Sequence, residues 1–246
     1  MKTYGLFIAL CLFLAIASPA KIKNGYTVDI EGARESLKRI KLLLEGDLPL
    51  LQRTSMKMKA NDLLDFITGY ELTGKFLDQF RMISPRLYLQ IDTLTDKRGR
   101  SVAVYVKLVT EREMSPGVAG TTNLAQDKND PDLYESEYGP HTVSVRIVIG
   151  KKSLHLLAHE LGHVRYQVPN LAAYVQFYAK FYLANTYTSK SLGHNDNDQS
   201  GQEARNFSNR FREDYLEFSR SGEEKLESYF TLLQVIKRRL SLEAKI

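Results

Sequence analysis

The sequence predicts an α+β fold: a small, mostly antiparallel sheet with a helix against it and a helical C-terminal half. Two observations predict it. Apolar residues recur at every second position in several short segments between residues 86 and 150, as in strands, and at every third or fourth position on both sides of this region, as in helices. The 246 residues are 43% hydrophobic, which suffices for the core of one domain.

The N-terminal part is predicted to be helical. Apolar side chains at helical spacing predict a helix over residues 32–45, which Gly46 and Pro49 would end. Residues 61–83 predict one or two further helices, with a break near Gly69.

The middle of the chain is predicted to supply the sheet. Residues 87–91, 102–106 and 143–149 are rich in β-branched and aromatic residues and predict three strands. Residues 96–99 predict a hairpin turn between the first two strands. The acidic segment from 114 to 141, broken by Gly and Pro, predicts a long solvated flap.

The rest of the chain is predicted to be helical to its end. Pro169, the polar stretch 193–201 and a Ser-Gly pair at 221–222 divide it into four helices, at about 152–168, 171–189, 200–220 and 223–243. One domain over residues 21–246 would account for all these elements.

The first twenty residues predict a secretory signal peptide. A Lys at position 2 precedes an apolar run over residues 6–17, and Ser18-Pro19-Ala20 offers small residues for cleavage after Ala20. The run is too short to span a membrane. The protein is therefore expected to be secreted or periplasmic, without a stable membrane anchor.

Cleavage after Ala20 would change the composition in two ways. It removes Cys11, the only cysteine, so neither a thiolate ligand nor a disulfide is expected in the mature chain. It leaves 33 basic and 29 acidic residues, a net charge of +4, and no run of like charge is longer than three residues. So small a net charge without a long basic run argues against nucleic acid as a partner.

Residues 159–163 contain the pattern His-Glu-x-x-His. On a helix, His159 and His163 are one turn apart on one face, where both imidazoles can bind one zinc ion. Glu160 points elsewhere and would accept a proton from a water that zinc activates for attack on a carbonyl. An extended peptide is expected to pair with the edge of the strand at 143–149.

The predicted order of a strand, a helix bearing His159-Glu160-Leu161-Gly162-His163 and further helices resembles the zincin metallopeptidases. The resemblance implies a zincin-like fold, Zn²⁺ as cofactor, a peptide or protein substrate, His159 and His163 as metal ligands and Glu160 as general base. The metzincin subclass is excluded, since Tyr166 and Pro169 occupy positions where that pattern needs Gly and His.

A third zinc ligand is expected from a carboxylate. The gluzincin subclass takes a Glu from a later helix, and Glu203 matches because it lies on the row of Phe207 and Phe211. In the alternative interpretation, Ser200 and Glu203 form a capping box that starts this helix.

Other acidic residues remain possible ligands: Asp196 and Asp198, in a stretch that faintly resembles that of the aspzincins, and Glu217 near the flank of the apolar stripe. Asp214 is expected to orient a ligand imidazole. His155 is expected to be a packed residue.

The sequence thus favours a secreted zinc-dependent peptidase. The alternative is a secreted zinc-binding module without catalysis. Glu160 favours the enzyme, because a purely structural zinc site has no use for a carboxylate beside the metal.

Overall fold

The computed structural model describes residues 21–26, 30–127, 130, 132–150, 152–176 and 198–220. The predicted signal peptide and the predicted helix at 223–243 lie outside these residues. So does most of the predicted helix at 171–189, of which residues 171–176 are described and helical.

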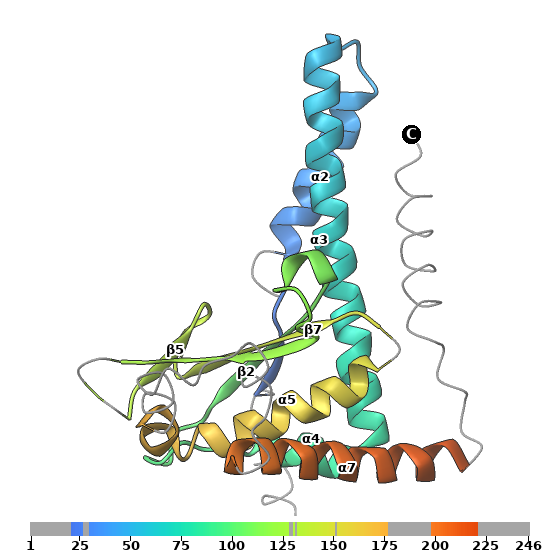
Figure 1. The fold of residues 1–246 in the computed structure, drawn as a ribbon. Helices are drawn as coiled ribbons and strands as arrows, with labels where there is room; N and C mark the ends of the chain where they lie inside the picture. The colour runs from blue at the N-terminus through green and yellow to red at the C-terminus, as the bar shows by residue number, and fades with distance from the viewer. Residues whose placement is uncertain are drawn as a thin grey trace, which may run out of the picture.

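A four-stranded sheet lies at the centre of an α+β fold (Figure 1). Its order is β1 (Ile22–Asn24), β2 (Ala103–Val109), β7 (Thr142–Val148) and β3 (Gly120–Asn123). β1, β2 and β7 run parallel, and only β3 runs antiparallel to its neighbour β7. The prediction of a mostly antiparallel sheet was therefore wrong: three helices between β1 and β2 return the chain so that the two strands run the same way.

One face of this sheet supplies much of the core. Val104, Val106 and Leu108 of β2 lie in register with Val143, Val145 and Ile147 of β7, and all six are almost fully buried. The residues between them, such as Ser144 and Arg146, face the opposite, polar side, as period-two alternation requires.

The predicted flap is β structure. After a short 3₁₀ helix, η1 (Glu111–Glu113), the chain forms β3 and a second sheet of β4 (Ala125–Gln126), β5 (Tyr134–Ser136) and β6 (Gly139–Pro140). Arg98 pairs with both Asp130 and Asp132, so two of the acids fasten this segment to the domain. These strands are too short to produce a period-two pattern in the sequence.

Residues 87–91 form a helix and not the predicted strand. α4 runs from Pro85 to Asp92, with Pro85 at its first position, where the missing N–H costs nothing. Leu87 and Ile91 are buried on one face, and Leu89 is exposed. A spacing of four satisfies both a helix and an alternating strand, so the apolar pattern alone was ambiguous.

The turn predicted at 96–99 is confirmed, but it does not join the two predicted strands, because residues 87–91 are helical. The Gly99 N–H donates to the Asp96 carbonyl at 2.9 Å, and Gly99 has a φ of +76°, which glycine adopts readily. An isolated bridge joins Thr95 and Ser101 around it.

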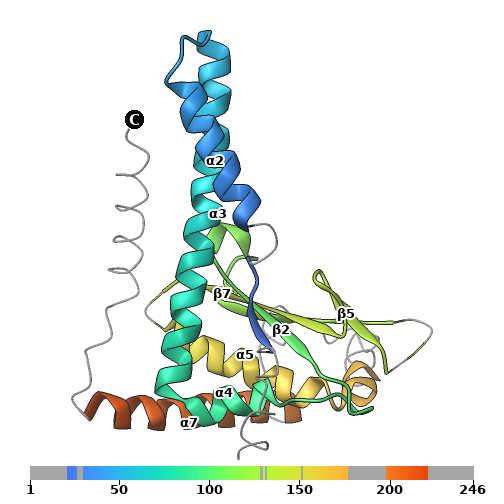
Figure 2. The same cartoon turned by 180° about the vertical axis from the view of Figure 1, so that it is seen from behind.

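A long antiparallel helical hairpin projects from the sheet (Figures 1 and 2). It consists of α2 (Ile30–Leu44), as predicted, and α3 (Leu50–Ile83), which is continuous through Gly69. A Cβ at Gly69 would lie 2.7 Å from the ring of Tyr26. The glycine therefore admits an aromatic ring and does not break the helix.

The helices predicted at 152–168 and 200–220 are confirmed as α5 (Ser153–Gln167) and α7 (Gln199–Arg220). α5 lies between the sheet and α7 (Figure 2) and contacts β3, β7 and α7. A Cβ at Gly162 would lie 2.6 Å from Cα of Ala204, so this glycine lets α5 and α7 approach closely. No helix in the described part of the chain is long and apolar enough to cross a membrane.

Candidate active site

α5 is held against the sheet by its apolar face. Leu157, Leu161 and Val164 are fully buried. On the same helix, Glu160 contacts Thr122 of β3, and His163 contacts Ser200 of α7. His163 and Glu160 are therefore buried as well, at 8% and 6% exposure.

The two histidines of the motif are close neighbours. The ring centroids of His159 and His163 are 5.0 Å apart, with the ring planes at 89° to each other. Their positions one helical turn apart bring both imidazoles to one place, which suits two nitrogen ligands of a single zinc ion.

Ser200, from the first turn of α7, holds His163. Its Oγ lies 2.8 Å from His163 Nδ1, and Gln167 Nε2 donates to the same oxygen at 3.2 Å. When Nδ1–H is the donor, Nε2 keeps the lone pair that a metal requires. This role of Ser200 was not predicted, because the sequence pattern assigns its hydroxyl to the helix cap.

Asp198 caps α7 instead. Its Oδ1 accepts the backbone N–H of Ser200 at 3.0 Å, and its carbonyl accepts that of Gln202 at 2.9 Å. The predicted capping box of Ser200 and Glu203 is therefore wrong. With the cap two residues earlier, the Ser200 hydroxyl is available to His163.

Glu160 lies between α5 and the edge strand β3. The Thr122 hydroxyl is 2.8 Å from Glu160 Oε2 and 3.1 Å from the Glu160 backbone carbonyl. A Cβ at Gly120 would lie 2.8 Å from Oε1, so glycine leaves room for the carboxylate. Two β3 residues thus define the place of Glu160.

Burial raises the pKa of Glu160 to about 7, although the hydrogen bond from Thr122 lowers it. A carboxylate with this pKa exchanges a proton readily near neutral pH, which is what a general base requires.

The carboxylate of Glu203, the predicted third ligand, forms an ion pair with Arg165 of α5. The described residues contain no group of three His, Cys, Asp or Glu side chains placed to hold a metal. Glu203 therefore stays a prediction, and as a ligand it would have to leave Arg165.

The other acidic residues considered as third zinc ligands lie elsewhere in the fold. Asp198 is buried at the start of α7 and serves as its cap, Glu217 is exposed on α7, and Asp196 lies outside the described residues.

The carboxylate of Asp214 accepts a hydrogen bond from Ser84, at the junction of α3 and α4, where it fixes these helices to α7. His155 packs against the rings of Phe211 and Tyr215, as expected of a packed residue.

The edge expected to bind a peptide belongs to β3. β7 has partners on both sides, whereas β3 ends the sheet among the described strands. The prediction for β7 was wrong because β3, which occupies its edge, was read as part of a flap.

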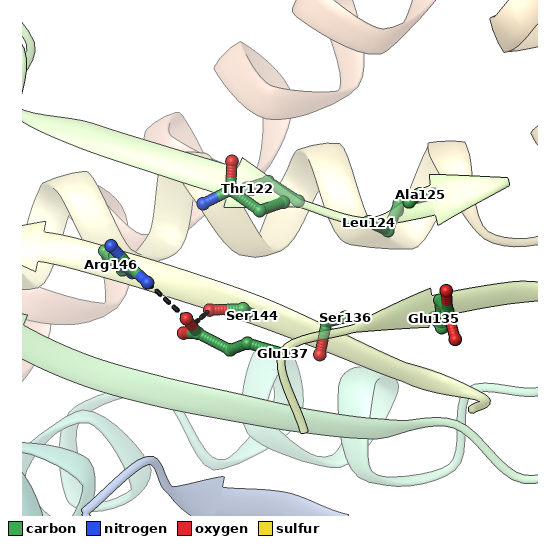
Figure 3. A pocket seen from close by; sticks show the side chains of 9 residues that line it. Thr122, Leu124, Ala125, Glu135, Ser136, Glu137, Ser144 and Arg146 are labelled. Atoms are coloured by element: carbon green, nitrogen blue, oxygen red, sulfur yellow. Dashed lines mark hydrogen bonds and ion pairs between the residues drawn. The ribbon is translucent and has the colours of Figure 1, made fainter. Parts of the chain in front are cut away.

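A polar cavity of about 550 Å³ opens beside this edge, on the face of the sheet that carries Ser144 and Arg146 (Figure 3). Arg146 forms an ion pair with Glu137, which also accepts a hydrogen bond from Ser144 at 3.0 Å. Burial would raise the pKa of Glu137, but these two hydrogen bonds outweigh it and hold the pKa below its usual value. No pattern in the sequence predicts this cavity, whose walls come from β3, β4, β5 and β7.

Comparison with family models, with curated proteins and with solved structures finds no match to this chain.

Proposed function

We propose that this protein is an exported zinc-dependent peptidase in which His159 and His163 bind the metal and Glu160 is the general base. The observation that carries the proposal is the grouping on α5: two imidazoles whose ring centroids are 5.0 Å apart and, on the residue after His159, a buried carboxylate whose pKa is about 7. The two imidazoles suit zinc by donor type, and the third ligand is expected from a carboxylate, with Glu203 the first candidate.

Zinc, when bound, supplies a Lewis acid that acidifies water and polarises a substrate carbonyl. The chain's own residues orient the metal ligands and transfer the proton. Ser200 orients the ring of His163. Glu160 accepts a proton at its carboxylate and later gives it to the leaving amine, and Thr122 holds that carboxylate in place.

The substrate is expected to be an extended peptide that pairs with β3. An edge strand offers unpaired backbone N–H and C=O groups, and peptides bind such edges by adding a strand. Because Thr122 of β3 contacts Glu160, a peptide on this edge would pass close to the general base.

A second candidate function is a zinc-binding module that binds a partner without cleaving it. The burial of Glu160 and His163 beneath β3 and α7 favours it, since a closed site admits a substrate poorly. The two functions differ in whether the carboxylate of Glu160 is needed.

The test is cleavage of a mixed peptide library by the mature chain, with products identified by mass spectrometry. We expect the wild type to cleave and Glu160→Gln, which keeps the size of the side chain, to lose cleavage and keep zinc. Glu111→Gln is the matched control, because Glu111 is an exposed residue of η1. Zinc binding without cleavage by the wild type would overturn the peptidase in favour of the binding module.

A further inference from the structure

The tip of the α2–α3 hairpin exposes an unusual amount of apolar surface. The stretch 38–59 contains nine Ile, Leu and Met residues, and none of its 22 residues is buried. Leu42 and Leu43 are 61% and 50% exposed, and Leu50 and Leu51, at the start of α3, are 79% and 85% exposed. An exposed apolar patch of this kind marks an interaction surface.

The tip contributes little to the core, although half-buried Ile40 packs against it. The last buried residue of α2 is Leu37 and the first of α3 is Ala60. Everything between them lies on the part of the hairpin that projects away from the sheet (Figures 1 and 2). The exposed leucines at the tip are therefore not explained by folding.

Basic residues surround these apolar side chains. The same stretch carries six basic and two acidic residues, a net charge of +4: Lys38, Arg39, Lys41, Arg53, Lys57 and Lys59 against Glu45 and Asp47. This equals the charge of the whole predicted mature chain, so the positive charge is concentrated at the tip.

The order of residues in α3 makes the first turns of that helix amphipathic. At 100° per residue, Leu50, Leu51 and Met58 fall within about 100° of one another on the helix, and Thr54, whose hydroxyl donates to the Leu50 carbonyl, lies between them. Lys57 lies just beyond one border of this stripe and Lys59 beyond the other. An apolar stripe between lysines is typical of a helix that lies at a membrane surface.

We propose that the hairpin tip, residues 38–59, docks onto a membrane surface of anionic phospholipids. The exposed leucines enter the boundary between headgroups and acyl chains, and the basic residues contact the lipid phosphates. The association is peripheral and reversible. It is independent of the proposed peptidase activity, and it would hold the domain beside a membrane.

A lipid surface fits this tip better than a protein does. Four of the six basic residues are lysines, which are depleted in protein–protein interfaces. Anionic membranes, in contrast, attract lysine and arginine alike. A bilayer also closes around a projecting tip without needing a complementary groove.

The experiment is co-sedimentation of the mature chain, residues 21–246, with vesicles. The mature chain is used because the apolar run at 6–17 would itself bind lipid. One set of vesicles is phosphatidylcholine alone and the other is phosphatidylcholine with phosphatidylglycerol. We expect binding to the anionic vesicles to be about tenfold tighter or more and to weaken as salt is added.

The double variant Leu50→Ser/Leu51→Ser should reduce this binding about tenfold or more. Its matched control is Met82→Ser/Leu89→Ser, which removes two side chains that are each 58% exposed but lie away from the tip. Circular dichroism confirms that both variants fold. The control should bind like the wild type.

Absence of wild-type binding to anionic vesicles, or equal binding by the Leu50→Ser/Leu51→Ser variant, would overturn the proposal. Light scattering tests whether a second copy of the chain, and not a membrane, covers the tip. A dimer of the wild type that this variant abolishes would mean that a second copy of the chain covers the tip, and would also overturn the proposal. None of these outcomes depends on zinc or on cleavage.

Discussion

Replacing Glu160 by glutamine should change how the stability of the metal-free protein depends on pH. The Glu160 side chain is buried, and burial raises its pKa from 4.5 to about 7. Between these values the folded protein keeps the proton while the unfolded chain has lost it. The folded state then binds more protons, so the free energy of unfolding falls as the pH rises.

The size of the effect follows from the two pKa values. One pKa unit corresponds to about 1.36 kcal/mol, and the shift is about 2.5 units, so ionisation of Glu160 removes about 3 kcal/mol between about pH 4.5 and pH 8. Glutamine carries no charge and should keep this stability. Every other group titrates alike in both proteins and cancels in the comparison.

The assay is urea unfolding in the presence of a chelator at several values between about pH 5 and pH 8. We expect Glu160→Gln to gain about 2.5 kcal/mol on the wild type across this range, and the exposed control Glu111→Gln to follow the wild type. A difference between Glu160→Gln and the wild type that does not change with pH would refute the buried, proton-binding carboxylate on which the general-base role depends.

Two further predictions concern the metal. Ser200→Ala should weaken zinc binding about 10- to 100-fold, because the Ser200 hydroxyl orients His163, whereas Ser219→Ala, on the exposed end of the same helix, should not; equal zinc affinity of both variants would contradict this role. Glu203→Gln should weaken zinc binding more than Ser200→Ala does if Glu203 is the third ligand. A loss of stability with unchanged zinc affinity would instead show that Glu203 serves only its ion pair with Arg165.

The parts of the fold that were predicted from the sequence are those whose patterns repeat over many residues. α5, α7 and β7 each carry a long apolar pattern of one period, so their places were clear. Leu87 and Ile91 show where apolar spacing fails to predict secondary structure, because their spacing fits a strand and a helix equally well. Proline at the first helical position was the signal that could have decided for the helix.

The errors about the sheet have a different cause. Whether β1 and β2 pair in parallel depends on where the intervening helices return the chain, and no local pattern records that. β3 has only four residues, and its importance comes from the contact of Thr122 with Glu160, 38 positions later.

In the candidate site, too, residues close in sequence were predicted and contacts between distant segments were not. His159, Glu160 and His163 are linked by spacing within one helix, which a sequence displays directly. Ser200 reaches His163 only because Gly162 lets α5 and α7 approach each other, and that contact joins two distant segments.

The central claim is tested most directly by restoring zinc to chelated, mature protein and following cleavage of a peptide that the wild type cuts. We predict no cleavage without metal, full cleavage at about one zinc per chain, and none by Glu160→Gln at the same zinc content. Cleavage that persists in the chelator, or equal cleavage by Glu160→Gln, would contradict the claim that this motif forms a zinc peptidase site.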